Sequence, residues 1–283
     1  MYNLIVENKA GERLELTHNS NYVVVDINGL NPPEAIINAT RSAGADGSVF
    51  NSAFVDNRTI IITLAINEPA EKNRIALYRY FSSKNPVRLY YSNGTRNVYI
   101  DGFVKGVPID FFAKKQTFQV TIFCPNPFFN VDSDSVVDFS LVRGLFEFPF
   151  SVEDNDPIEF GEILTESETN IINYGDTDSG AVFVIRAKGS LTNPVIYNAG
   201  TGEYFGLTIS LSQGDEIRIN TKKKQKSAIL IRSGVKTSVV GNMTSGSTWL
   251  QLAAGDNLFT ISAATNPENM SVYCIQTTQY EGV

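Results

Sequence analysis

The sequence predicts a mainly β protein of two domains, with one α-helix in the first. Apolar and polar residues alternate over most of the chain, which is the period-two pattern of half-buried strands. One segment, "NEPAEKNRIALYRYFSS", breaks this alternation with helical spacing. The second half consists of short alternating runs cut by Gly, Asn, Asp and Ser. Their regular spacing is typical of an antiparallel β-sandwich.

Length and composition indicate a folded chain and exclude several classes of protein. The 283 residues suffice for two cores, and 42% apolar with 19% charged residues excludes disorder. No apolar run is long enough to cross a bilayer, so we expect no membrane partner. The start, "MYNLIVENKAGERLEL", lacks the features of a signal peptide, so we expect folding in the cytoplasm. The net charge of −7 argues against a nucleic-acid partner.

In two predicted strands of the first domain, the alternation shows which side chains share a face. The run "RTIIITLAI" is rich in β-branched residues, and we expect it to be covered on both faces. Its first face carries Ile60, Ile62, Leu64 and Ile66. The run "KQTFQVTIFC" points Phe118, Val120, Ile122 and Cys124 to one side. The two cysteines, Cys124 and Cys274, are expected to be reduced, buried thiols.

Two hairpins are indicated by their turns. Asn93-Gly94 separates two strand-like runs and tolerates the left-handed dihedrals of a tight turn, although flanking polar residues can lengthen the loop. In "GDEIRINTKKKQKSAILIR" the cluster Lys222-Lys223-Lys224 lies between two alternating runs. We interpret the lysines as a solvated hairpin tip, because no aromatic residues interleave with them for nucleic-acid stacking.

The helix is predicted over about residues 68–83. Asn67 is a plausible cap, Pro69 falls in the first turn, and acidic residues follow near the positive end of the dipole. Ile75, Tyr78 and Phe81 form an apolar stripe that should lie on a sheet.

An acidic stretch separates the two predicted domains. The segment "EDNDPIEFGEILTESET" contains no basic residue, and repulsion among its carboxylates favours an extended form. We therefore predict a first β domain over 1–134, a junction or extended arm over 135–169, and a second domain over 170–283. A surface loop within one domain is the alternative interpretation of the acidic stretch.

The chain shows no convincing catalytic or metal-binding constellation. His18, the only histidine, lies in a turn-like polar segment without a nucleophile motif. Asp132 and Asp134 alternate like the start of a calcium loop, but the central Gly and terminal Glu are missing. Glu166 and Glu168 lie in the acidic stretch, where nothing would separate their pKa values. We expect no enzyme activity, no metal and no cofactor.

Trp249 is the only tryptophan and has two interpretations. In "STWLQL", Leu250 and Leu252 share one face, which leaves Trp249 and Gln251 on the other. A packing role is favoured, since a lone aromatic on a strand usually completes a core. The other interpretation makes Trp249 and Gln251 candidate carbohydrate contacts.

The order of these motifs resembles the siphophage distal tail protein family. In the first half the resemblance rests on "AGADGS", "NRTI", the helix "RIALYRYF" and "VTIFCPNPFF"; in the second half it rests on "INYGDTDSGAVFVIRAKGSLTNPVIYNAGTGEYFGL", "GDEIRINTKKK" and "GSTWLQLAAGDN". The match covers nearly the whole chain. It implies an N-terminal β-sandwich or split barrel with one helix and a galectin-like C-terminal β-sandwich.

The same resemblance implies a structural role at the tail tip of the virion. Family members form a homohexamer ring, the baseplate hub, which joins the tail tube protein to the tail-associated fibre or lysin protein. The C-terminal domain is in some members a dock for receptor-binding proteins. Assembly is expected in the host cytoplasm. The alternative function is a carbohydrate-binding module that helps the phage adhere to a cell-wall glycan through Trp249.

Overall fold

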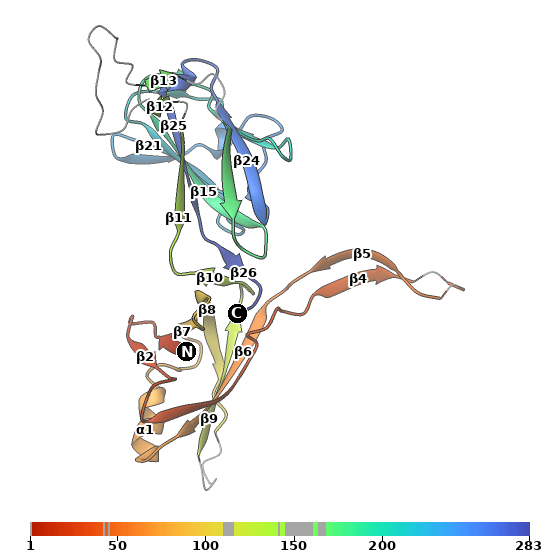
Figure 1. Ribbon diagram of the computed structural model, residues 1–283, viewed down its shortest axis with the longest axis vertical. Coiled ribbons are helices and arrows are strands. Elements are labelled where there is room, and N and C mark those ends of the chain that lie inside the picture. The colour runs from red at the N-terminus through yellow and green to blue at the C-terminus, as the bar shows by residue number, and fades with distance from the viewer. Residues whose placement is uncertain are drawn as a thin grey trace, which may run out of the picture. The chain divides into compact units, whose positions relative to one another are not determined.

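The computed structural model describes residues 2–41, 43–44, 46–109, 116–140, 142–144, 161–163 and 168–283. It forms two compact units: unit 1 is Met1–Asp132 with Gln279–Val283, and unit 2 is Ser133–Thr278. Unit 2 is therefore inserted into the sequence of unit 1. The mainly β fold class is confirmed (Figure 1). The split-barrel and galectin-like descriptions stay predictions.

Unit 1 is built on one antiparallel sheet, with strand order β2-β1-β7-β8-β9-β6-β3 and with β10 pairing to β8 and β26. Its strands are β1 (Asn3–Glu7), β2 (Arg13–Glu15), β3 (Tyr22–Asn28), β6 (Arg58–Ile66), β7 (Pro86–Ser92), β8 (Asn97–Gly106), β9 (Thr117–Cys124), β10 (Phe129–Val131) and β26 (Gln279–Tyr280). A separate pair, β4 (Ile36–Thr40) and β5 (Val49–Phe54), completes the unit.

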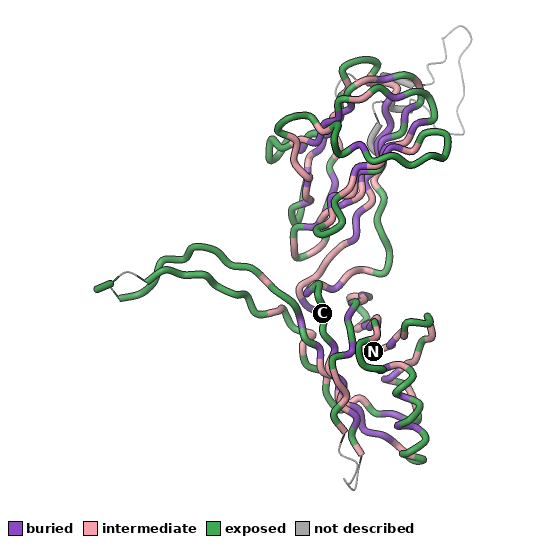
Figure 2. The backbone as a smooth tube through the Cα atoms, turned by 180° about the vertical axis from the view of Figure 1, so that it is seen from behind, coloured by how far each residue is buried: buried purple, intermediate pink, exposed green. Residues whose placement is uncertain are grey.

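The predicted facing of β6 and β9 is confirmed. The strands pair along their length, and their inward side chains are at most 5% exposed: Ile60, Ile62, Leu64, Ile66, Phe118, Val120, Ile122 and Cys124. Figure 2 shows this alternation of buried and exposed positions along the sheet. The expected burial of both faces of β6 holds only at Ala65 on the second face, because Thr59 is exposed and Ile61 and Thr63 are half-buried.

The helix is shorter than predicted and turns a different face inward. Helix α1 covers Ala70–Leu77 and buries Asn73, Arg74 and Leu77. Ile75 is 55% exposed, so the predicted stripe is wrong. Phe81 is buried because the chain leaves the helix before it and packs its ring 5.8 Å from that of Phe118.

Asn67 does not cap this helix. Its side chain donates to the carbonyl of Ser20 at 2.8 Å, and its own carbonyl accepts from the side chain of Asn73. The cap position belongs to Pro69, which has no side chain able to accept a hydrogen bond.

The turn at Asn93-Gly94 is confirmed with a lengthened loop. Ser92 pairs with Asn97, which leaves four loop residues. The side-chain oxygen of Asn93 accepts from the backbone N–H groups of Thr95 and Arg96, and Gly94 has φ +87°. Asn93 therefore stabilises the turn through its side chain, and Gly94 supplies the left-handed dihedral.

Unit 2 contains two main antiparallel sheets, β11-β25-β15-β20-β21-β22 and β14-β24-β17-β18. Its strands are β11 (Ser135–Ser140), β12 (Val142–Gly144), β13 (Gly161–Ile163), β14 (Glu168–Asn173), β15 (Ser179–Ala187), β16 (Leu191–Thr192), β17 (Val195–Asn198), β18 (Tyr204–Gly206), β19 (Ser210–Leu211), β20 (Glu216–Asn220), β21 (Ser227–Arg232), β22 (Val235–Ser238), β23 (Gln251–Leu252), β24 (Gly255–Ser262) and β25 (Met270–Gln276). Two short 3₁₀ turns lie between strands: η1 (Val240–Asn242) between β22 and β23, and η2 (Pro267–Asn269) between β24 and β25. The fully buried rings of Phe183 and Phe259 meet at 5.6 Å between the two sheets.

The described start of the predicted junction belongs to unit 2. Strand β11 pairs with β25 from end to end, and β12 pairs with β13. Most of the acidic stretch, including Glu166, lies outside the described residues. The described part of 135–169 is thus strand and not an extended arm.

The hairpin carrying the lysine cluster is confirmed. Strands β20 and β21 pair on either side of it, and Lys223 and Lys224 are exposed. Lys222 differs, because its ammonium donates to the hydroxyl of Thr277 at 2.9 Å.

Asp215, at the start of this hairpin, should make the stability of unit 2 depend on pH. The side chain is 4% exposed and accepts from Arg232 at 2.6 Å and from the N–H of Ser212 at 2.8 Å. The hydrogen bond from Arg232 lowers the pKa of Asp215. A depressed folded-state pKa stabilises unit 2 above the unfolded pKa near 4, and this stabilisation disappears as pH falls through the folded value.

We expect Asp215→Asn to lower the urea midpoint of unit 2 at pH 7. At pH 2.5 the midpoint of the variant should approach that of the wild type. Trp249 is the only tryptophan and lies in unit 2, so its fluorescence reports this unit. A constant difference between the urea midpoints of the two proteins over the whole pH range would contradict the proposed role of Asp215.

Candidate assembly surface

Strands β4 and β5 form an arm that projects from unit 1 (Figure 1). We call these two strands the arm. Their register runs from Ile36 opposite Phe54 to Thr40 opposite Val49, with an irregularity after Asn38. Every position of both strands is exposed, as Figure 2 shows. The arm therefore contributes nothing to the core of unit 1.

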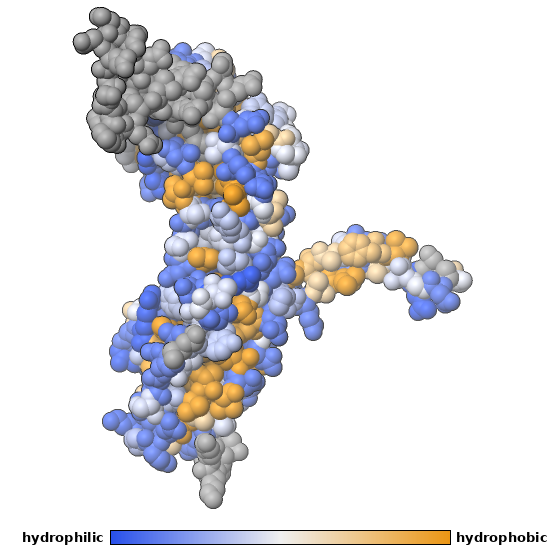
Figure 3. Space-filling view, in the orientation of Figure 1, coloured by the Kyte–Doolittle hydropathy of each residue, from blue (hydrophilic) through white to orange (hydrophobic). Residues whose placement is uncertain are grey.

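The strands of the arm carry no charge and expose several large apolar side chains. Neither strand contains Asp, Glu, Lys or Arg. Five large apolar side chains are 44–64% exposed: Ile36, Ile37, Val49, Phe50 and Phe54. Figure 3 shows hydrophobic residues along most of it. Exposed strands of soluble proteins are usually protected by charge or proline, and a contiguous apolar patch marks a contact surface.

Few interactions within the arm hold it together. The amide of Asn38 donates to the hydroxyl of Ser52 at 3.0 Å, and that of Asn51 donates to the hydroxyl of Thr40 at 2.6 Å. An isolated two-stranded hairpin is marginally stable in water, and three or more strands or a covering surface stabilise it. The outer edges of both strands are unpaired in the described part of the chain. The arm can thus accept a further strand or lie on another surface.

Gly29 fixes the place where the chain turns toward the arm. It follows β3 with φ +92°, and a Cβ there would lie 2.3 Å from the carbonyl oxygen of Thr59. Only glycine combines this dihedral with so close an approach to β6.

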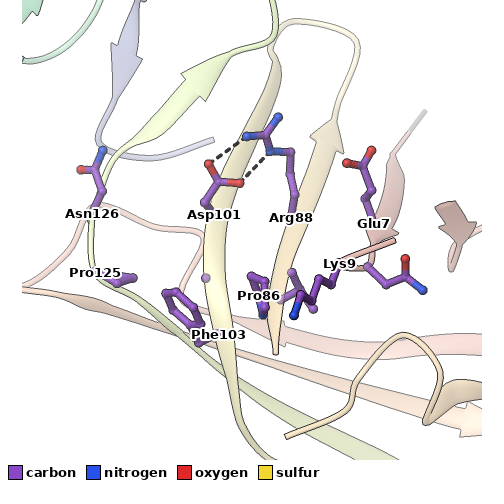
Figure 4. Close-up of a pocket in the computed structure, with 11 residues that line it drawn as sticks. Glu7, Lys9, Pro86, Arg88, Asp101, Phe103, Pro125 and Asn126 are labelled. Carbon is purple, nitrogen blue, oxygen red and sulfur yellow. Dashed lines mark hydrogen bonds and ion pairs between the residues drawn. The ribbon is translucent and has the colours of Figure 1, made fainter. Parts of the chain in front are cut away.

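A depression in unit 1 has a volume of about 500 Å³. Its lining includes Pro86, Phe103 and Pro125, with Phe103 45% exposed. Arg88 donates to both carboxylate oxygens of Asp101, at 2.6 and 3.0 Å (Figure 4). This hydrogen bonding raises the pKa of Arg88, so its guanidinium keeps its charge. The depression offers a mostly apolar contact area beside a satisfied ion pair.

The candidate reactive residues are not brought together. His18 and Glu168 are exposed on different units. Cys124 and Cys274 are buried free thiols, one in each unit, and burial raises the pKa of each to about 12. Among the described residues no group of three or more metal-ligating side chains occurs. In the same residues, no helix has the length and apolarity to span a bilayer.

Within unit 2, Trp249 packs against another ring and Gln251 makes hydrogen bonds. The Trp249 ring lies 5.3 Å from that of Phe205, and the ammonium of Lys226 lies 5.9 Å over its face. The amide of Gln251 donates to the carbonyl oxygens of Thr221, Trp249 and Leu250 at 2.9–3.1 Å. A carbohydrate contact at these two residues stays a prediction.

Two family models match the chain. Residues 9–124 match the phage tail protein RIFT-related domain, and residues 174–273 match the siphovirus-type tail component, C-terminal domain. No curated protein matches.

Solved structures of phage proteins share the fold. The chain is similar to the SPP1 Dit protein, described as a paradigm of the hub adsorption apparatus in Gram-positive infecting phages, with TM-score 0.68, 12% identity and 99% of each chain covered. It is also similar to a chain of the phage P2 baseplate in its activated conformation with Ca, with TM-score 0.52, 14% identity and 100% of each chain covered.

The two matched domains, in this order, define a structural component of a siphovirus-type tail. The chain belongs to the siphophage distal tail protein family.

Proposed function

We propose that the chain assembles into a homohexameric ring at the tail tip, and that the arm makes the contact between neighbouring copies. The single observation that carries this proposal is the exposed, charge-free apolar surface of the arm. A ring uses head-to-tail contacts that close after a fixed rotation, so each copy needs two different surfaces. An arm and the surface that receives it satisfy this requirement.

Covering the arm supplies part of the free energy that a specific contact needs. Each of the five large apolar side chains is about half exposed, and covering that half yields about 1 kcal/mol per side chain. One arm thus gains on the order of 5 kcal/mol before the costs of association. This value exceeds what scattered surface residues contribute.

The ring would serve as a connector between other tail proteins. By the family resemblance we infer that it joins the tail tube protein to the tail-associated fibre or lysin protein, with unit 2 as a dock for a receptor-binding protein. We infer a structural and non-enzymatic role, with assembly in the host cytoplasm. The similarity to a protein described as a hub supports this reading. Carbohydrate binding is less favoured, since Trp249 and Gln251 are already engaged in packing.

Native mass spectrometry of the purified chain, combined with negative-stain microscopy, tests the ring. We expect a homohexamer mass and ring-shaped particles with a central hole at micromolar concentration. A strictly monomeric protein at all concentrations, with no ring in isolated tails, would overturn the proposal.

A further inference from the structure

We propose that the segment Gln279–Val283, here called the strap, positions the root of the arm and is required for ring assembly. The root is the stretch Gly29–Pro32 between β3 and β4. This inference deepens the proposed function and rests on the arm being the contact between copies. The strap follows unit 2 in sequence but belongs to unit 1, so it completes the root only after the chain has passed through unit 2.

The strap is anchored to the sheet of unit 1 at its first residues. Within β26, Gln279 pairs with Asn130 and Tyr280 pairs with Phe129 of β10. The amide of Gln279 also donates to the side-chain oxygen of Asn130 at 2.9 Å. The guanidinium of Arg96 lies 3.9 Å over the Tyr280 ring and donates to the carbonyl oxygen of Gly282. These contacts fix the path of the strap.

From this anchored path the strap lies directly on the root. The N–H of Val283 donates to the carbonyl oxygen of Leu30 at 3.2 Å. A Cβ at Gly282 would lie 2.8 Å from Cδ and 3.0 Å from the backbone nitrogen of Pro32. The two backbones are thus so close that even a methyl group requires one of them to move.

Arg58 joins the strap and the root through one buried side chain. It is 4% exposed and donates to the carbonyl oxygens of Gly29 at 2.6 Å and Asn31 at 2.9 Å in the root. It also donates to the carbonyl oxygen of Glu281 in the strap and to that of Pro127 at 2.6 Å. The guanidinium stacks 4.6 Å over the Phe129 ring. A buried cation is tolerated only when its donors are satisfied.

These contacts set the direction in which the arm leaves unit 1. The arm itself packs on no core, so its orientation is set where it joins unit 1, at the root before β4 and at residues 55–57 between β5 and β6. The root carbonyls of Gly29 and Asn31 bind the same guanidinium that binds the strap, and the strap touches Leu30 and Pro32. Arg58 and the strap are therefore positioning residues for assembly. They couple the orientation of the arm to the segment that follows unit 2 in the sequence.

The test combines Gly282→Ala with the matched control Gly106→Ala. Gly106 lies in the same unit, has an ordinary φ, and has open space around its Cβ position. Spin labels at Ala53→Cys in the arm and Lys105→Cys in β8, both exposed, report the arm orientation by pulsed electron resonance. The protein is kept dilute, so that it is monomeric. Ring formation is then measured by native mass spectrometry.

We expect Gly282→Ala to broaden the distance distribution and to raise the concentration for half-assembly by about tenfold, with little change in the melting temperature. Gly106→Ala should match the wild type. Arg58→Lys, which keeps the charge but lacks the fork that spans several carbonyls, should also broaden the distribution.

A lowered melting temperature with an unchanged distance distribution would mean that the strap is merely structural, and would overturn the inference. Rings that form at wild-type concentrations despite a broadened distribution would also overturn it. If the wild type forms no ring, the proposed function fails, while the distance distribution still decides whether the strap orients the arm.

Discussion

Ile62→Asp is expected to unfold unit 1 and to leave unit 2 folded. Ile62 is fully buried on β6, with Val120 as its paired neighbour on β9. An aspartate there places a charge in an apolar core without a partner, and it also removes the packing of the isoleucine. Such a change costs at least about 4 kcal/mol. That value is a large fraction of the about 5–15 kcal/mol by which a domain is stable.

Two optical signals separate the units in this experiment. Far-ultraviolet circular dichroism should lose the contribution of unit 1, whereas Trp249 fluorescence should keep its native emission, because this residue lies in unit 2. Ile61→Asp is the matched control, since Ile61 is half-buried on the opposite face of the same strand. An unchanged melting temperature for Ile62→Asp, or equal damage from both variants, would show that the facing of β6 is wrong.

The strands of both units could be predicted because their burial follows directly from the alternation of residue types. Ile60, Ile62 and Leu64 share a face in any extended conformation, and that face is the apolar one. The helix was harder to predict. Its buried face includes Asn73 and Arg74, which a search for apolar spacing passes over, and its end at Leu77 places Phe81 outside the helical wheel.

The exposure of the arm could not be predicted from periodicity. The runs Ile36–Thr40 and Val49–Phe54 have ordinary strand composition, and the pattern of a strand does not tell whether its partner belongs to the same chain. The signal available was the lack of charge in both runs, since edge strands that stay exposed usually carry it.

The strap was also beyond sequence reasoning. The run "TTQYEGV" ends a β-rich segment and carries no apolar alternation of its own. Its place in unit 1 is set by backbone carbonyls that accept hydrogen bonds from Arg58 and Arg96. Because every residue has a backbone carbonyl, the sequence does not indicate which ones accept.

The double variant Ile37→Asn with Phe50→Asn should abolish the ring while leaving the monomer folded. The two side chains are 64% and 63% exposed on the arm, so their loss costs the isolated chain little. In a contact between copies, each removes about 1 kcal/mol of apolar burial. About 2 kcal/mol per contact corresponds to a roughly 30-fold weaker contact. Because every contact around a closed ring is weakened alike, the loss compounds.

Val235→Asn is the matched control, since Val235 is 65% exposed on β22 of unit 2 and lies outside the arm. Native mass spectrometry should show monomers for the double variant and rings for the control, with the same melting temperature for both. Rings formed by the double variant at wild-type concentration would mean that the arm is not the contact between copies. Because asparagine is polar, the double variant should not aggregate, so a loss of rings can be assigned to the weakened contact. The experiment therefore separates an arm that binds a neighbouring copy from one that has no role in assembly.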